Sequence, residues 1–156
     1  MPAFQLQPLN TLTDDSGQPL ARIEHDPAHQ LLAVHWFGNL TGRQVIQVAR
    51  STIRPGAPGA PGAYRLLLND KRQATGDWSE ALDWLEYEWL PQALASGLHA
   101  VAYVFTPDMH NQLASYRFVE RLNLHVHIEI FPDVPGALHW LAEIGTTPAV
   151  TGPGTA

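Results

Sequence analysis

Cysteine is absent from this chain of 156 residues. Its absence excludes disulfide bonds, thiolate catalysis and zinc sites built from cysteine. Basic residues are also scarce: 9 lysines and arginines, almost all of them arginine, stand against 15 acidic residues, and the formal net charge is -6. Such a chain lacks the positive surface that nucleic acid or an anionic membrane requires, so we expect neither as a partner.

Long apolar runs are missing as well. No segment approaches the length of a membrane span, and residues 1–10 have neither the basic start nor the apolar run of a signal peptide. We therefore expect a chain without a membrane span, located in the cytoplasm. Because 45% of the residues are hydrophobic, the chain can bury a core of its own, and we expect one domain over residues 1–145.

Turn signals and hydrophobic periodicity predict an α/β fold that begins with an antiparallel hairpin. The strands that these signals predict are residues 20–25, 30–37, 64–69, 99–105 and 124–131. The helices that capping residues predict begin near Gly42, Asp77 and Thr106, and at residue 134 after Asp133. This order gives a mostly parallel sheet of about five strands flanked by about four helices.

Two segments fit neither a helix nor a strand. Residues 54–63 repeat Pro-Gly-Ala after an arginine, so we expect a mobile loop there. Residues 146–156 are almost entirely Thr, Pro, Gly and Ala, which offer little apolar surface to bury. We expect them to form a disordered tail.

Several segments together resemble STAS-like domains, the small SpoIIAA-like family. The residues that carry the resemblance are Trp36-Phe37-Gly38, Leu66-Leu67-Leu68-Asn69-Asp70, the tryptophan-rich segment 78–90, Gly97 before a strand, and Phe131 with Trp140-Leu141. The family is similar in fold to anti-sigma factor antagonists and to lipid-binding domains of the CRAL-TRIO type. The resemblance therefore implies a regulatory or partner-binding role without a cofactor, and it leaves a lipid or another small ligand open.

The resemblance also implies a phosphorylation site. In anti-sigma factor antagonists a serine followed by glycine, in the loop before the second helix, is phosphorylated by the partner kinase and so switches binding. Thr75-Gly76 is the nearest match in this sequence, although Gln73 stands where the family has aspartate. The alternative is that Thr75 and Gly76 only lead into the helix cap at Asp77.

A strand-like segment carries the pattern of a metal site. His125, His127 and Glu129 alternate along it, so their side chains would share one side of a strand and could bind a metal ion such as zinc. The alternative is an edge strand, in which the apolar residues from Leu124 to Ile130 are buried and the histidines line the polar face.

The carboxyl ends of neighbouring parallel strands meet at one edge of a sheet, which is where ligands bind in open α/β folds. The polar residues expected near that edge are Asn69, Asp70, Lys71, Arg72, Thr106, Asp108, His110 and Asp133. The three aspartates with the lysine could hold a magnesium ion or a phosphate group. The alternative is that Thr106, Asp108 and Asp133 serve only the first turns of helices.

The helix expected after Asp77 has more aromatic residues than one core-facing stripe needs. Trp84 and Tyr87 lie at the flanks of that stripe, among acidic residues. Aromatic side chains inside an acidic rim suit a protein interface, including that of a homodimer. The alternative is that the Pro-Gly loop half covers them.

No nucleophile elbow, phosphate-binding glycine loop or dinucleotide-binding fingerprint is present, so the sequence offers no support for an enzyme. Our first hypothesis is a module without a cofactor that binds a protein partner or a second copy through Asp70, Lys71, Thr75, Trp84, Tyr87 and Asp108. The second hypothesis is a protein that binds a small ligand, a lipid or a metal ion, through the strand-end aspartates or the segment with His125, His127 and Glu129.

Overall fold

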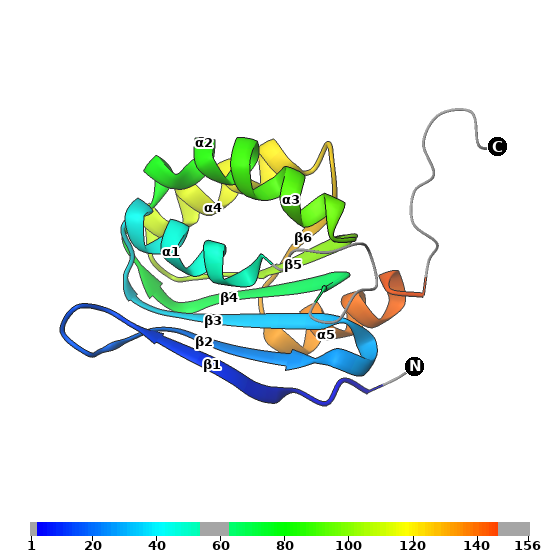
Figure 1. The fold of residues 1–156 in the computed structure, drawn as a ribbon. Helices are drawn as coiled ribbons and strands as arrows, with labels where there is room; N and C mark the ends of the chain where they lie inside the picture. Colours follow the sequence, from blue (N-terminus) through cyan, green and yellow to red (C-terminus); the bar gives the residue numbers. More distant parts are fainter. Residues whose placement is uncertain (1–2, 54–62, 147–156) are drawn as a thin grey trace.

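The computed structural model describes residues 3–53 and 63–146, which form a six-stranded sheet with helices on both faces (Figure 1). The strands are β1 (Gln7–Thr13), β2 (Pro19–Asp26), β3 (Leu31–Asn39), β4 (Leu66–Thr75), β5 (Ala100–Val104) and β6 (His127–Phe131). The helices are α1 (Gly42–Thr52), α2 (Leu82–Trp84), α3 (Leu90–Ala95), α4 (Met109–Leu122) and α5 (Val134–Ile144). Short 3-10 turns cover Pro27–His29 and Ser79–Ala81, and a π-helix, Leu85–Trp89, joins α2 to α3.

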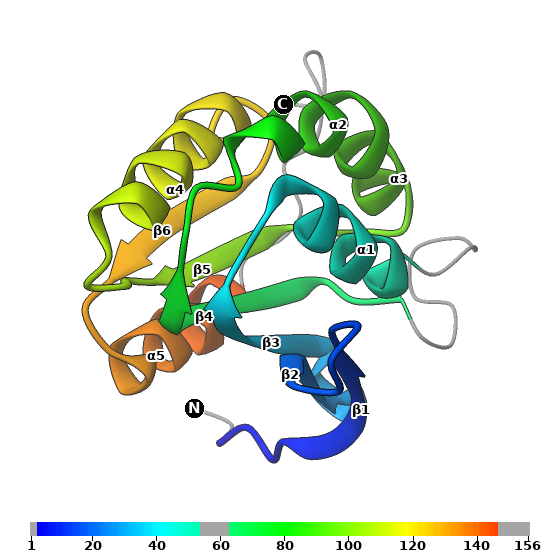
Figure 2. The same cartoon turned by 90° about the vertical axis from the view of Figure 1, so that its left-hand side faces the viewer.

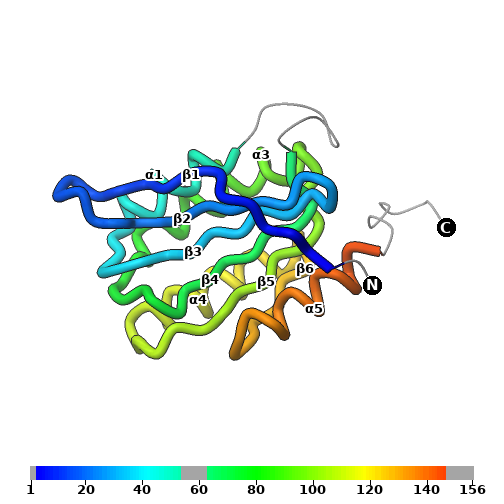
Figure 3. The backbone as a smooth tube through the Cα atoms, turned by 90° about the horizontal axis from the view of Figure 1, so that it is seen from below, coloured from blue at the N-terminus to red at the C-terminus, as the bar shows by residue number. Residues whose placement is uncertain are grey.

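The strands lie in the sheet in the order in which they occur along the chain. β1, β2 and β3 pair antiparallel, and β3 to β6 pair parallel. The helix layer, made of α1, the α2–α3 segment and α4, covers one face, and α5 lies on the other (Figure 2). From that other side the strands follow one another from β1 to β6, with α5 beside the β5–β6 end (Figure 3). The expected α/β fold is confirmed.

Capping residues place the starts of α1 and α5 where the sequence predicts them. The Thr41 hydroxyl accepts a hydrogen bond from the Gln44 amide, and the Gln44 side chain accepts one from the Thr41 amide, which completes a capping box. At α5 the Asp133 carboxylate accepts a 2.7 Å hydrogen bond from the Gly136 amide. Local hydrogen bonds therefore fix the first residue of each of these two helices.

The first strand, β1, was not predicted. Six of its seven residues are exposed, so the segment shows no alternation of buried and exposed side chains. It is held instead by backbone pairing with β2, from Gln7 opposite His25 to Thr13 opposite Pro19. An edge strand of this kind leaves little trace in a hydrophobic pattern.

The strand β4 is longer than predicted. The prediction ended it at Asn69, because the following residues are polar, but pairing with β3 continues to Thr75 opposite Asn39. Asp70 and Lys71 therefore lie inside a central strand and not in a loop at its end. Alternate side chains of a strand point to opposite faces, so these two neighbours are in different environments.

Pro91 lies in the first turn of α3, directly after the π-helix, where the Leu90 amide donates to the Leu85 carbonyl. Two other boundaries were wrong. Thr106 does not cap α4; the Asp108 carboxylate accepts from the Asn111 amide and is the cap. The last strand begins at His127, not at residue 124. The predicted loop at 54–63 and tail at 146–156 lie outside the described residues, except for their end residues 63 and 146.

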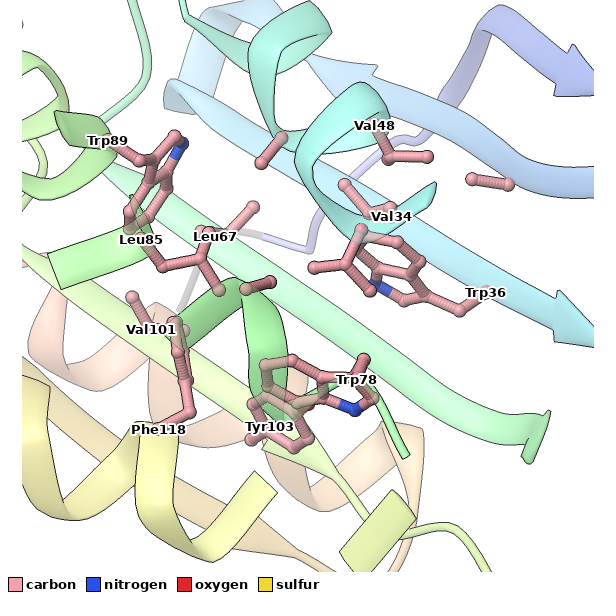
Figure 4. Close-up of a cluster of buried hydrophobic side chains, with 14 of the residues drawn as sticks. Val34, Trp36, Val48, Leu67, Trp78, Leu85, Trp89, Val101, Tyr103 and Phe118 are labelled. Carbon is pink, nitrogen blue, oxygen red and sulfur yellow. The ribbon is translucent and has the colours of Figure 1, made fainter. Parts of the chain in front are cut away.

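The sheet separates two hydrophobic clusters. The larger one lies under the helix layer and contains aromatic side chains from the strands and the helices, among them Trp36, Trp78, Trp89, Tyr103 and Phe118 (Figure 4). The smaller one lies under α5. Leu67 belongs to the larger cluster and Leu66 and Leu68 to the smaller, so β4 is buried on both faces.

Candidate functional site

Lys71 is the only lysine in the sequence, and the fold leaves it 2% exposed. It follows Leu67 and Asn69 at alternate positions of β4, and these three side chains line one cavity under the helix layer. Lysine is almost never fully buried unless it is paired. Its surroundings therefore decide whether it has a structural or a chemical role.

Aromatic rings surround the Lys71 amine. Its Nζ lies 4.0 Å from the ring centre of Trp36, 4.2 Å from that of Trp78 and 5.9 Å from that of Tyr103. Figure 4 shows these three rings in the same buried cluster; Trp36 lies on β3, Tyr103 on β5, and Trp78 just before the 3-10 turn Ser79–Ala81. Nζ has no hydrogen-bond partner within the part of the chain that the structure describes. No carboxylate in that part contacts it.

Burial lowers the pKa of Lys71 well below the ordinary value of a lysine. Moving an ammonium ion from water into a protein interior costs on the order of 20 kcal/mol in an idealised calculation, and several kcal/mol after relaxation. A desolvated contact between a cation and an aromatic face returns about 2 kcal/mol. The rings of Trp36 and Trp78 offset part of this cost.

A cavity of about 30 Å³ adjoins the amine. Its walls are aromatic and aliphatic, with Asn69, Thr52 and Lys71 as the polar members that are not aromatic. A water molecule needs about 10–15 Å³ measured in this way, so the cavity accommodates about two water-sized molecules. It is therefore matched to a very small ligand and not to a lipid.

The indole N–H groups around the cavity differ in their pairing. Trp36 donates to the Asn69 side-chain oxygen at 3.1 Å, and Trp89 donates to the Thr52 hydroxyl at 3.2 Å. Trp78 Nε1 is buried and has no acceptor among residues 3–53 and 63–146. A buried donor left unpaired costs about 1–3 kcal/mol. Both Lys71 and Trp78 line the cavity, so a small molecule with an acceptor oxygen suits them.

Asp70 belongs to a separate polar network on the opposite face of the sheet. Its carboxylate accepts two 2.8 Å hydrogen bonds from the Arg72 guanidinium and lies 2.9 Å from His35 Nδ1. The other ring nitrogen of His35 lies 2.6 Å from the Glu24 carboxylate. The network ties β2, β3 and β4 together.

These hydrogen bonds decide the charge of Asp70. Burial by itself raises the pKa of Asp70, but the hydrogen bonds from Arg72 and His35 outweigh it and hold that pKa well below the ordinary value of an aspartic acid. Asp70 is therefore a charged, fully partnered side chain. The geometry gives it a structural role and places it away from the Lys71 cavity.

The predicted cluster at the strand ends does not form. Asp108 caps α4 and also accepts a 3.0 Å hydrogen bond from the Gly76 amide, while Asp133 caps α5 on the other face. Within the described ranges no three His, Cys, Asp or Glu side chains are placed to hold a metal ion. The strand-end aspartates are instead separated by the sheet or used as caps.

The loop with Thr75 and Gly76 is held by the start of α4. The Thr106 hydroxyl donates to the Ala74 carbonyl at 2.5 Å, and the Asn111 side chain donates to the Thr75 carbonyl at 3.2 Å. Gly76 has a φ of 91°, and a Cβ there would lie 2.7 Å from the Leu40 carbonyl. Thr75 is exposed, and its phosphorylation stays a prediction.

The predicted metal ligands on the last strand are not brought together. His125 lies in the turn before β6, whereas His127 and Glu129 are exposed on β6 itself. The His127 ring lies 5.0 Å from the ring of His99. The alternative interpretation expected Leu124 to be buried. Leu124 is instead 83% exposed, because β6 begins three residues later, at His127.

The two aromatic residues predicted to form a contact surface differ in exposure. Trp84 is half-buried against the core, and the Arg50 guanidinium lies 5.3 Å from its ring centre. Tyr87 is 67% exposed. The more coherent apolar surface lies on α4, where Met109, Leu113 and Tyr116 are 70%, 53% and 46% exposed.

Sequence reasoning missed the Lys71 cavity and the apolar side of α4. The sequence did contain a signal for the Lys71 cavity. Lys71 is the one lysine in a chain whose other Lys/Arg residues are arginines, and it follows Asn69 by two positions and Leu67 by four. For the second, Met109, Leu113 and Tyr116 recur at a spacing of four and three residues, which is helical. The spacing alone does not show whether such a stripe faces the core or solvent.

Comparisons with protein-family models, with curated proteins and with solved structures found no match to this chain. Across the described residues, no helix combines the length and apolar character of a membrane-spanning segment.

Proposed function

We propose that this chain is a STAS-like regulatory module that binds a protein partner through the outer side of α4. The observation that carries the proposal is the α4 stripe, defined by Met109, Leu113 and Tyr116, which are at least 46% exposed. The three side chains recur at positions i, i+4 and i+7 and therefore share one side of the helix. Single exposed apolar residues are ordinary, but three on one side form a contiguous patch.

The α4 stripe lies opposite the side of the helix that packs on the sheet. The core-facing residues of α4 include Ala114, Phe118 and Leu122, which are at most 3% exposed. The ring of Tyr116 also packs edge-on against Phe105, with 5.9 Å between ring centres. This contact holds the Tyr116 ring in place, which reduces the ordering that a partner would have to impose on it.

The neighbouring edge of the sheet adds to this surface. β6 pairs with β5 on one side, and no described strand pairs with its other side. Unpaired strand edges beside apolar helix faces are places where a second chain docks. The STAS-like part of the proposal rests on the sequence segments named above, such as Trp36-Phe37-Gly38 and Leu66-Leu67-Leu68-Asn69-Asp70. The proposal keeps the cytoplasmic location that the sequence predicts.

The test compares Leu113→Asp with Leu124→Asp. Both residues are exposed leucines, at 53% and 83%, but Leu124 lies in a turn outside the stripe. Sedimentation velocity measures self-association, and quantitative affinity capture from a lysate measures hetero-partners. We expect Leu113→Asp to lose a dimer or a captured protein that Leu124→Asp retains, with unchanged melting temperatures. Identical mass and identical captured proteins for both variants and the parent would overturn the proposal.

A further inference from the structure

We propose that Lys71 is a nucleophilic amine that forms a Schiff base with a small aldehyde in the cavity under the helix layer. This activity is separate from the partner binding proposed for α4. The Lys71 Nζ is buried, lines the cavity and has no hydrogen-bond partner in the described part of the chain. A desolvated lysine in an apolar pocket is the form of lysine that attacks carbonyl carbon atoms.

The size and the walls of the cavity select the chemical class. A volume of about 30 Å³ admits a molecule of two or three heavy atoms, such as acetaldehyde, and excludes sugars or lipids. The protonated product is a cationic iminium. Its nitrogen is the Lys71 Nζ atom, which lies 4.0 Å from the ring centre of Trp36 and 4.2 Å from that of Trp78. Aromatic faces attract cations. Carbon dioxide would instead give an anionic carbamate, and no arginine among the described residues lines the cavity.

The reaction balances with water as the only by-product. The lone pair of the Lys71 nitrogen attacks the carbonyl carbon, a C–N bond forms, and the carbonyl π electrons move to oxygen. A proton passes from nitrogen to that oxygen and gives a carbinolamine. Loss of the hydroxyl group with the second nitrogen proton releases water and leaves the C=N bond.

Trp78 is a positioning residue for this step. Its buried N–H has no acceptor among the described residues, and its ring lines the same cavity. A carbonyl or carbinolamine oxygen would supply that acceptor. Among the described residues that line the cavity, Tyr103 is the other titratable one, and its hydroxyl accepts a 3.0 Å hydrogen bond from Ser115.

A second cavity of about 30 Å³ adjoins the first. The two share Thr52, Leu67 and Trp89 as lining residues. The second also contacts Tyr64 and Ser96, which are half-buried. The shared lining residues place the two cavities side by side.

The experiment traps the imine in the folded protein. The chain is incubated with acetaldehyde and sodium cyanoborohydride, and the ethylated amines are counted by intact mass and located by peptide mapping. The sequence simplifies the assignment, because Lys71 and the N-terminal amine are the only amines of this kind. We expect an adduct at Lys71 in the folded protein whose rate rises with pH clearly less steeply than that of an ordinary lysine, which gains about tenfold per pH unit below its pKa.

Two variants provide the controls. Lys71→Met should show the N-terminal adduct alone. Trp78→Phe shortens a buried core side chain, so it should lower the melting temperature. In the folded protein it should slow the adduct at Lys71 several-fold while the N-terminal rate stays the same. Labelling of Lys71 only after unfolding in guanidinium would overturn the proposal. So would a Lys71 rate that rises about tenfold per pH unit up to pH 9, because the amine would then behave as an ordinary lysine.

Discussion

Replacing Lys71 by methionine should remove a rise in stability that the parent protein shows above neutral pH. Burial lowers the pKa of Lys71 in the folded state, while the unfolded chain has an ordinary lysine with a pKa of about 10.4. Between those two values the unfolded state binds one more proton than the folded state. Stability rises with pH wherever the unfolded state binds more protons. The parent should therefore gain stability relative to Lys71→Met as the pH increases.

The size of the effect follows from the linkage relation. One proton of difference changes the free energy of unfolding by roughly 1.4 kcal/mol per pH unit. If the folded protein keeps the amine neutral from pH 7 to pH 9, the difference between parent and variant shifts by about 3 kcal/mol. Total stabilities of domains are about 5–15 kcal/mol, so the shift is large enough to measure.

The assay is urea unfolding of both proteins at pH 7, 8 and 9, followed by tryptophan fluorescence. All other titrating groups are common to the two proteins, so their contributions cancel in the difference. Methionine has nearly the length of lysine and packs well on aromatic rings. Any constant gain or loss from its packing also cancels, because the prediction concerns the slope. A difference that does not change with pH would show that the folded protein keeps Lys71 charged, held by the rings of Trp36 and Trp78, and would refute the reasoning.

Three further changes test the rest of the structure. Asp70→Asn should lower the free energy of unfolding by about 2 kcal/mol at pH 7. Because folding lowers the pKa of Asp70, this difference in unfolding free energy between parent and variant should shrink below about pH 4, as urea unfolding at a series of acidic pH values would show. Gly76→Ala should cost about 1–3 kcal/mol in thermal unfolding, because φ is 91° and the new Cβ would press on Asn39 and Leu40; an unchanged melting temperature would contradict the loop geometry. Asp108→Ala should cost about 1–2 kcal/mol in chemical unfolding through the lost cap of α4.

Local signals were enough to predict much of this fold. The capping box at Thr41 and the cap at Asp133 depend on side chains within three residues of the backbone groups they satisfy, so the sequence contains the whole interaction. A continuous apolar run such as Leu66-Leu67-Leu68 is typical of a strand buried on both faces, and the structure divides it between the two clusters. Such features need no knowledge of distant parts of the chain.

The errors arose where a distant strand decides the outcome. β1 is a strand because β2 offers it an edge, and its own side chains are mostly exposed. β4 continues through Asp70 and Lys71 because β3 pairs with it as far as Asn39 opposite Thr75. The same limit applies to the candidate site. Asp70 and Lys71 can be assigned to opposite faces of the sheet only when it is known that β4 extends through both residues.

Asp70 and Lys71 are neighbours in β4, yet the structure gives them opposite roles. Asp70 has an arginine and a histidine as partners, so its charge is stabilised where it lies. Lys71 has no hydrogen-bond partner in residues 3–53 and 63–146, and stability gives no reason for an amine there, because a buried charge without a partner is often less stable than an apolar group of similar size. Proteins usually retain a destabilising buried group of this kind only at functional sites. Lys71→Met should therefore be more stable than the parent at pH 7 and should also lose the aldehyde adduct. A variant that loses the adduct without gaining stability would point to a charged Lys71 that the aromatic rings stabilise.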